Sequence, residues 1–519
     1  MLPRFDNVAP SVRRIIAGSS AALLAFVALA AWALASPVGA SPDDDYHLVS
    51  IWCGAGEREG LCETPAGAEP GGDTRVVPDD LFRESICYAF KPAVSASCQD
   101  GLEGGRMTET DRGNFEGDYP PVFYGVMSIF AGENIQVSVL IMRFANAALF
   151  VGLLSVLTWL TPAARRSALV LPVVVTVVPL GMFIISSINA SSWALLSAAT
   201  LWVSLNNYFE ASGRRRWVFA ALAGLALVIG AGARADSAAY AGLAIVGVLI
   251  LQARRSRDFA VSAILPIVLI AVAIAFYRLS GQSGAAVEGL DADDEYARPA
   301  WELFQALIAV PDLWVGAVGK WGLGWLDTYM PALVWVSSFA VFAGVIFFGL
   351  SRPGVRKYIA TGLMFAALWG VPALLQWQSH AAVGAYIQPR YILPLAILLV
   401  GFALVKTREP GTELSVAQIV VVVLALSAAN SLALHTNIRR YVTGSDVGGG
   451  NLSANAEWWW NAGPTPMVTW LIGSIAFALC LTLLGVLVER VRSRGHEELR
   501  APTREREPAS DPEAVALVV

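Results

Sequence analysis

Long apolar stretches recur along the chain and are separated by short polar segments. About 20 mostly apolar residues suffice for a helix to cross the hydrocarbon core of a membrane. We therefore predict an all-α fold, a polytopic bundle of about twelve spans within one integral membrane domain, residues 1–489. The predicted spans are residues 15–37, 135–160, 167–187, 192–209, 217–233, 237–253, 259–279, 331–350, 358–375, 391–406, 414–434 and 466–489.

The first of these stretches has a second interpretation. Its basic start and the small residues near Ala35 and Ala40 are also typical of a cleavable signal peptide. The apolar stretch is longer than the usual signal core of about 7–15 residues. We favour a retained membrane anchor, and in both interpretations the following segment lies outside the cytoplasm.

Composition supports a membrane protein. Of the 519 residues, 56% are hydrophobic and only 15% are charged, whereas about 25% of the residues of soluble proteins are charged. A water-facing surface for a soluble protein of this size cannot be built from so few charges. The same numbers exclude a disordered chain, a collagen and a coiled coil.

Basic residues predict the orientation of the bundle. With twelve spans, the basic connections all lie on one side, and the positive-inside rule makes that side cytoplasmic. We expect a multi-pass protein of the inner (plasma) membrane with both termini in the cytoplasm, including a disordered tail at residues 490–519. The basic connections contain Arg165, Arg166, Arg214, Arg215, Arg216, Arg254, Arg255, Arg257, Arg352, Arg356, Lys357, Lys406 and Arg408.

Two segments on the opposite, extracytoplasmic side are acidic. Residues 38–118 contain seventeen acidic and six basic residues, and residues 280–330 contain eight acidic and two basic residues. We expect a first outer loop at 38–134 and a second at 280–330. Within them, residues 120–131 and 301–329 combine aromatic, apolar and charged residues in a way typical of helices at the membrane interface. The net charge of −5 thus conceals two faces of opposite sign.

Four of the five cysteines, Cys53, Cys62, Cys87 and Cys98, lie in the first outer loop, and Cys480 lies in the last predicted span. An even set in an oxidising compartment predicts two disulfides. Three pairings are open, of which Cys53–Cys62 with Cys87–Cys98 is the most local. A zinc site is the alternative, but the closely spaced pairs usual for zinc ligands are missing.

The segment directly after the first span reads Ser41-Pro-Asp-Asp-Asp-Tyr-His47. One interpretation is structural, because serine, proline and acids suit the start of a helix. The other is chemical. Asp43 and His47 are four residues apart and share one helical face, which suits a general base with a proton-bearing partner. Asp43 and Asp44 could also hold a divalent cation.

Charges inside or beside predicted spans are candidates for function. Arg143 lies about 12 Å deep in the second span at 1.5 Å per residue. Arg234 and Asp236 flank the break between the fifth and sixth spans, where they could simply pair. Arg390 opens the tenth span from outside. Its guanidinium could bind a phosphate with two hydrogen bonds or anchor the helix to lipid headgroups.

The sequence lacks the motifs of nucleotide-driven chemistry, with no P-loop and no glycine-rich dinucleotide turn. The nucleophile elbow of hydrolases and the H-E-x-x-H zinc motif are also missing. We expect no nucleic-acid partner, whereas membrane lipid is an expected one.

Four motifs in register, over roughly residues 20–440, resemble those of a bacterial polytopic membrane family, domain of unknown function 2142. The family patterns are P-D-E-x-x-H, P-P-x-x-Y, G-W-L-D-x-x-x-P and Q-G-R-Y-L-L-P. Two positions depart from them, with Asp44 replacing glutamate and Pro389 replacing glycine. The matching segments are Pro42–His47, Pro120–Tyr124, Gly324–Asp327 with Pro331, and Gln388–Pro394.

The resemblance implies likeness to the GT-C glycosyltransferases, which take a sugar from a polyprenyl-phosphate donor on the outer membrane face. The acceptor would be an envelope glycan or lipid. Mg²⁺ or Mn²⁺ is the expected cofactor where a cation is needed. The implied roles are catalysis by Asp43, Asp44 and His47; donor-phosphate binding by Arg390, Tyr391 and Arg234; acceptor or sugar contact by Trp325, Asp327 and Tyr124; and metal binding by Asp43 and Asp44.

Two other functions compete with this interpretation. Twelve spans with both termini inside are common in transporters and flippases, which here would move lipid-linked or envelope precursors. Such proteins usually hold their polar site near the membrane midplane in repeated halves. Here the halves show no similarity and the polar residues gather outside. The third candidate is a non-enzymatic assembly or sensor protein that binds a partner through its disulfide-bonded outer loop.

Overall fold

The protein is described here from a computed structural model. The described residues are 10–67, 72–99, 102, 106–281, 299–351, 354–379, 383–384, 386–405 and 414–500. The predicted tail lies outside them from residue 501 on, as does the acidic run at 291–295 in the second outer loop.

The chain is mostly helical, with 70% helix and 3% strand, which confirms the all-α class. Its two strands, β1 (Arg75–Pro78) and β2 (Met107–Thr110), form one antiparallel pair with Arg75 opposite Thr110. The α-helices are α1 (Pro10–Leu34), α2 (Asp44–Trp52), α3 (Asp80–Arg83), α4 (Val122–Met127), α5 (Ile135–Leu160), α6 (Arg166–Thr176), α7 (Leu180–Ile185), α8 (Ser191–Glu210), α9 (Gly213–Ala231), α10 (Ala235–Gln252), α11 (Arg257–Ser262), α12 (Ile264–Leu279), α14 (Ala300–Ala317), α15 (Ala332–Leu350), α16 (Val355–Gln378), α17 (Pro389–Leu404), α18 (Val416–Val442) and α19 (Pro466–Arg500). The 3₁₀ turns are η1 (Glu84–Cys87), η2 (Ala96–Cys98), η3 (Ser128–Phe130) and η4 (Ala163–Arg165).

Eight helices of the described chain are long and apolar enough to cross a membrane, by length and composition. They coincide with eight of the predicted spans, and the second of them, α5, begins and ends at the predicted residues. The eight are Ile15–Leu34, Ile135–Leu160, Ala235–Gln252, Arg257–Leu279, Ala332–Leu350, Val355–Gln378, Val416–Val442 and Pro466–Glu489.

The count of about twelve is not confirmed, because four predicted spans are not among these eight helices. The third breaks at Pro179 into α6 and α7. The fourth and fifth become α8 and α9, which carry serines, asparagines or arginines. The tenth becomes α17, which has only 16 residues. Every residue of α17 except Tyr391 is buried, so this helix packs among other helices.

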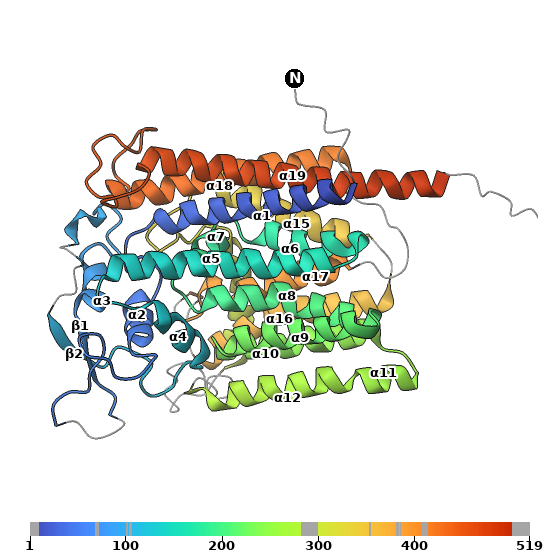
Figure 1. Cartoon of the computed structure of the whole chain (residues 1–519), viewed down its shortest axis with the longest axis horizontal. Coiled ribbons are helices and arrows are strands. Elements are labelled where there is room, and N and C mark those ends of the chain that lie inside the picture. Colours follow the sequence, from blue (N-terminus) through green and yellow to red (C-terminus); the bar gives the residue numbers. More distant parts are fainter. Residues whose placement is uncertain are drawn as a thin grey trace, which may run out of the picture.

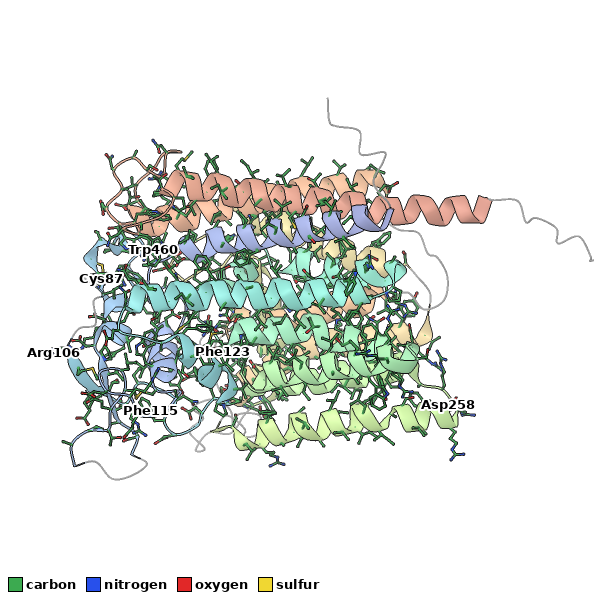
Figure 2. All side chains as sticks on the ribbon, viewed as in Figure 1. Cys87, Arg106, Phe115, Phe123, Asp258 and Trp460 are labelled. Atoms are coloured by element: carbon green, nitrogen blue, oxygen red, sulfur yellow. A yellow bond between two sulfur atoms is a disulfide. The ribbon has the colours of Figure 1, made fainter. Side chains whose placement is uncertain are left out.

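The long helices run along one common direction and give the molecule two distinct ends (Figure 1). At the first, which we call the loop end, the segment from α2 to α4 gathers beside the turn that follows α18. Arginines line the other, which we call the arginine end. There Arg165 pairs with Glu210 and Arg216 donates to Ser262 Oγ at 2.8 Å. Asp258 is seen at this end, whereas Cys87, Phe115 and Trp460 lie at the loop end (Figure 2).

The loop end is held by two disulfides, Cys53–Cys62 and Cys87–Cys98. The prediction of two bridges is confirmed, with the most local of the three pairings. Cys480 is a free, buried cysteine. Since each bridge closes a loop of about ten residues, each shapes a local turn and does not connect distant parts of the chain.

The two predicted interfacial segments both contain helices, short ones in the first and an 18-residue helix in the second. Residues 120–131 contain α4 and η3, and 301–329 contain α14 followed by turns without helix. α14 lies along α16, where Trp369 Nε1 donates to the carbonyl of Leu307 at 2.7 Å and Trp377 Nε1 to that of Pro299 at 3.1 Å. One side of α14, including Trp301 and Phe304, is exposed.

Candidate functional site at the loop end

The turn between α1 and α2 carries the candidate base, Asp43. Asp43 is the N-cap of α2, and its backbone is left-handed, with φ 60° and ψ 22°. A non-glycine residue there stores a small strain, which is commoner at functional sites than elsewhere. The side chain of Asp43 does not cap the helix. The helix therefore begins after Asp43, later than the predicted start at Ser41, and leaves this carboxylate for other partners.

The principal contact of Asp43 is Arg390, although 347 residues separate them. Arg390 Nη2 lies 2.5 Å from Asp43 Oδ2 and also donates to the hydroxyl of Tyr391 at 2.8 Å. Arg390 sits in the first turn of α17, behind Pro389. The side chain of Arg390 is 7% exposed and that of Asp43 is 37% exposed. A ligand can therefore reach the Asp43 carboxylate directly, whereas the Arg390 guanidinium lies largely covered behind it.

The protonation of Asp43 is set by two opposing effects. Partial burial raises its pKa, but the charge of Arg390 lowers it, helped by Arg112 and Arg234. The charges dominate, so the pKa of Asp43 lies below its usual value of 3.8. At neutral pH the group is a carboxylate, the form that can accept a proton.

A second arginine stands beside the first. Arg234 makes two hydrogen bonds to Asp236, at 2.8 and 2.9 Å, which confirms the predicted pairing. Its guanidinium carbon lies 4.5 Å from the centre of the Tyr391 ring, and that of Arg390 lies 4.6 Å from the same centre. Tyr391 thus holds both guanidinium groups close to one aromatic ring by cation–π contact.

His47 is buried among tyrosines one helical turn after Asp43. Its Nδ1 lies 2.9 Å from the hydroxyl of Tyr124, and its ring also contacts Tyr46 and Tyr119. Burial lowers the pKa of His47 to about 3 against the opposing effect of Asp43, and the charges of Arg234 and Arg390 act in the same direction as burial. His47 is therefore a neutral imidazole that fixes the tyrosine hydroxyl beside the site.

Asp44 faces away from this site. Its side chain is fully buried, and Oδ2 accepts from the backbone N–H of Ser41 at 3.0 Å. Oδ1 accepts no hydrogen bond from the described residues. Burial raises the pKa of Asp44 to about 8, despite the opposing charge of Arg143. Asp45 turns to Arg112 at 2.8 Å. The three adjacent carboxylates therefore have three separate environments.

The two metal candidates, Asp43 and Asp44, do not converge on one point. Within the described part of the chain, no group of three or more His, Cys, Asp or Glu side chains could hold a metal ion. Asp43 could offer a divalent cation one carboxylate, and further oxygens would have to come from substrate or water.

The remaining candidates divide into two groups. Tyr124 joins the site through His47. Trp325 and Asp327 lie next to the segment before Asp43: Trp325 Nε1 donates to the carbonyl of Gly39 at 2.9 Å, and Asp327 forms a buried ion pair with Arg440 at 2.7 Å. The structure thus brings six candidates together as one constellation, called here the Asp43 site: Asp43, His47, Tyr124, Arg234, Arg390 and Tyr391.

Three neighbours of the site did not emerge from the sequence. The centre of the Tyr119 ring lies 5.6 Å from the guanidinium carbon of Arg234. Arg112 pairs with Asp45. Asn114 accepts a hydrogen bond from the Tyr46 hydroxyl at 3.2 Å. Tyr119 directly precedes the Pro120-Pro121 motif, which is the one signal that could have indicated it. The others lie in an irregular loop, where spacing carries no information.

Comparison with known proteins gives one match. Residues 26–399 match the family described as predicted membrane proteins of domain of unknown function 2142 (DUF2142). This range includes the four resembling motifs and all members of the Asp43 site. No curated protein and no solved structure matches the chain.

Proposed function

The chain belongs to the membrane-protein family of domain of unknown function 2142, and from its site we propose that it is a membrane glycosyltransferase. The donor is a sugar on a polyprenyl phosphate, and the acceptor is a glycan or lipid of the cell envelope. Transfer takes place at the loop end, which we place on the extracytoplasmic face. The contact of the accessible Asp43 carboxylate with Arg390 is the observation that carries the proposal.

Asp43 has the properties of the general base. It is ionised and reachable, whereas Asp44 is buried and holds a proton up to about pH 8. In the proposed step, Asp43 takes the proton of an acceptor hydroxyl while the oxygen of that hydroxyl forms a bond to the anomeric carbon of the donor sugar. The bond from that carbon to the phosphate oxygen breaks, and the polyprenyl phosphate leaves with the electron pair.

Arg390 has the properties of a phosphate site, and Arg234, which is paired with Asp236, lies beside it. Guanidinium groups bind phosphate oxygens with paired hydrogen bonds, and a fixed cation lowers the barrier by stabilising the charge that develops on the leaving group. Tyr391 orients both arginines. On donor binding, the phosphate approaches Arg390 while Asp43 turns to the acceptor hydroxyl.

The position of the site favours a lipid-linked donor. Asp43 follows α1 and Arg390 opens α17, so the site lies where apolar helices end. A donor anchored by its lipid in the membrane presents its phosphate at this level. The sequence lacks nucleotide-binding motifs, which agrees with a donor that carries no nucleotide.

The proposal is tested with purified protein, radiolabelled polyprenyl-phosphate sugars and envelope glycan or lipid acceptors. We expect transfer, with Arg390→Ala lowering its rate about 100-fold or more, the usual effect of removing a charge-stabilising group. Arg106→Ala is the matched control, because this arginine is 76% exposed and remote from the site. Lipid or solute flux into vesicles without any transfer would instead support a transporter.

A further inference from the structure

A second polar pocket opens at the loop end, separate from the Asp43 site. Its volume is about 420 Å³. Three segments form its wall: the turn after α14 with Asp327 and Thr328, the end of α18 with His435 and Arg439, and the following loop with Ser445 and Gly449. Ligand cavities for small molecules usually have about 300–1,000 Å³, so the pocket is large enough for one or two sugar units.

One wall of the pocket is rigid. Arg440 is fully buried and pairs with Asp327 at 2.7 Å. It also donates to the carbonyl oxygens of Val94 at 2.6 Å and Tyr88 at 2.8 Å. Since Asp327 neutralises Arg440, this pair contributes shape and no net charge to the pocket.

Arg439, one residue earlier, supplies an uncompensated positive charge. Its Nη2 donates to the carbonyl oxygens of Gly449 at 2.9 Å and Asn451 at 2.8 Å. No carboxylate of the described chain lies within ion-pair distance, and Nε has no hydrogen-bond partner there. Arg439 Nη1 also donates to the hydroxyl of Thr443 at 3.5 Å. A cation that is 7% exposed and whose hydrogen-bond partners are all uncharged attracts an anion.

The rest of the lining suits sugar hydroxyls. Thr328, Thr436, Tyr329 and Ser445 bring hydroxyl groups. The hydroxyls of Thr328 and Thr436 already donate within the protein, to Asp327 at 3.1 Å and to Leu432 at 2.8 Å, so both retain oxygens that can accept. The lining is therefore polar, with one cation and several acceptors.

We propose that this pocket, the Arg439 pocket, binds a saccharide that carries a carboxylate or a phosphate. Given the proposed transfer reaction, this saccharide is the acceptor. Trp325, two residues before Asp327, bonds the carbonyl of Gly39, and Asp43 is four residues further on. Because four residues of extended chain span at most about 14 Å, Gly39 and Asp43 lie within that distance of each other. In the proposal, an acceptor of a few sugar units is anchored at Arg439, extends along this segment and presents a hydroxyl to Asp43.

Binding is measured with the full-length protein in detergent by ligand-observed saturation-transfer NMR. The probes are glucuronate, glucose 6-phosphate and uncharged glucose. We expect at least one anionic probe to bind about fivefold or more tightly than glucose, and the stronger of the two identifies carboxylate or phosphate as the group recognised. Equal binding of all three probes would overturn the proposal.

Two variants of equal size that differ in charge locate the site. Ser445 is exposed, so Ser445→Asp and Ser445→Asn both leave the fold intact and differ by one charge. We expect Ser445→Asp and Arg439→Gln to abolish the preference for the anionic probe, and Ser445→Asn to keep it. An unchanged preference in Ser445→Asp would contradict the pocket.

A third variant separates this proposal from the proposed function. Asp43→Asn abolishes the proposed transfer but should leave binding of the anionic probe unchanged. Loss of binding in Asp43→Asn would assign the probe to the Asp43 site and refute the Arg439 pocket. Binding to wild type that depends on Arg439, in protein that shows no transfer, would uphold the pocket and refute the transferase.

Discussion

Asp43 and Asp44 show how far the roles of adjacent residues can diverge. Both are aspartates at the start of α2. Asp43 pairs with Arg390 and is partly exposed, whereas Asp44 is fully buried. The pKa of Asp43 lies below its usual value and that of Asp44 is raised to about 8. Asp43 can therefore act as a base at neutral pH, whereas Asp44 has a structural role as the acceptor of the Ser41 N–H.

The raised pKa of Asp44 predicts a pH-dependent stability. The protonated form contributes stability that is fully present below the unfolded pKa of 3.8 and is lost as the pH rises towards about 8. Asp44→Asn keeps an acceptor for the Ser41 N–H without titrating. We expect the melting temperature of Asp44→Asn, relative to wild type, to increase between pH 5 and pH 8. A constant difference over this range would contradict a buried, titrating Asp44.

At the scale of elements, α5 and α18 hold the turn that positions Asp43. Arg143 of α5 is fully buried and donates to the carbonyl oxygens of Ala33 at 3.0 Å, Ser36 at 2.6 Å and Pro37 at 2.6 Å. Asn437 of α18 donates to the carbonyl of Ala35 at 3.0 Å. The end of α1 is thus capped by side chains of two other helices, since its last carbonyls have no helical partners.

Arg143→Met should therefore destabilise the protein. It leaves three buried carbonyl oxygens without donors, and each unsatisfied group costs about 1–3 kcal/mol. We expect a clear drop in melting temperature in detergent. Ile141→Met, on the exposed side of the same helix, is the control and should melt as wild type. Equal melting of both variants would show that the turn is held by other contacts.

The Cys87–Cys98 bridge supports a neighbouring element. It closes the loop whose Tyr88 and Val94 carbonyls accept from Arg440. Replacing both cysteines by serine should cost about 3 kcal/mol for a loop of this length, measured by thermal unfolding. Because the Arg440 contacts would loosen, the same variant should bind the anionic probe more weakly. Unchanged unfolding would show that packing alone orders the loop.

Much of the element scale is predictable from sequence, and the exceptions have physical causes. α5 follows from its continuous apolar run. α8 does not qualify as a span by composition, because it contains several serines, a threonine and two asparagines. Some of these hydroxyls are satisfied within the helix, as when Thr200 donates to the carbonyl of Leu196 at 2.7 Å. The Asp43–Arg390 contact joins residues 347 apart. The motifs indicated Asp43 and Arg390 individually. The periodicity of the sequence cannot show that these two residues lie together in the fold.

At the scale of the molecule, opposite ends carry opposite chemistry. The segment from α2 to α4 and the turn after α18 lie together at the loop end (Figure 1). The disulfides, Asp43 and the loop that lines the Arg439 pocket belong to these segments, whereas Arg165 and Glu210 pair at the arginine end. From the positive-inside rule we propose that the arginine end faces the cytoplasm. Both proposed sites would then lie on the extracytoplasmic face, where envelope glycans are found.

Labelling of introduced cysteines tests this orientation. Ser212→Cys lies between α8 and α9 at the arginine end, and Ala454→Cys lies in the exposed loop after α18. A membrane-impermeant thiol reagent added to intact cells should label Ala454→Cys and reach Ser212→Cys only after permeabilisation. The reverse pattern would place the Asp43 site in the cytoplasm and refute extracytoplasmic transfer.

The central claim is that Asp43 is the base of a sugar transfer. The most direct measurement compares transfer from a polyprenyl-phosphate sugar by Asp43→Asn and Asp45→Asn. Both variants remove one carboxylate from the same turn, but Asp45 contacts Arg112 and not Arg390. We predict that Asp43→Asn lowers the rate about 100-fold or more, the usual contribution of a general base, and that Asp45→Asn stays within a few-fold of wild type. Transfer by Asp43→Asn at the wild-type rate would contradict the account.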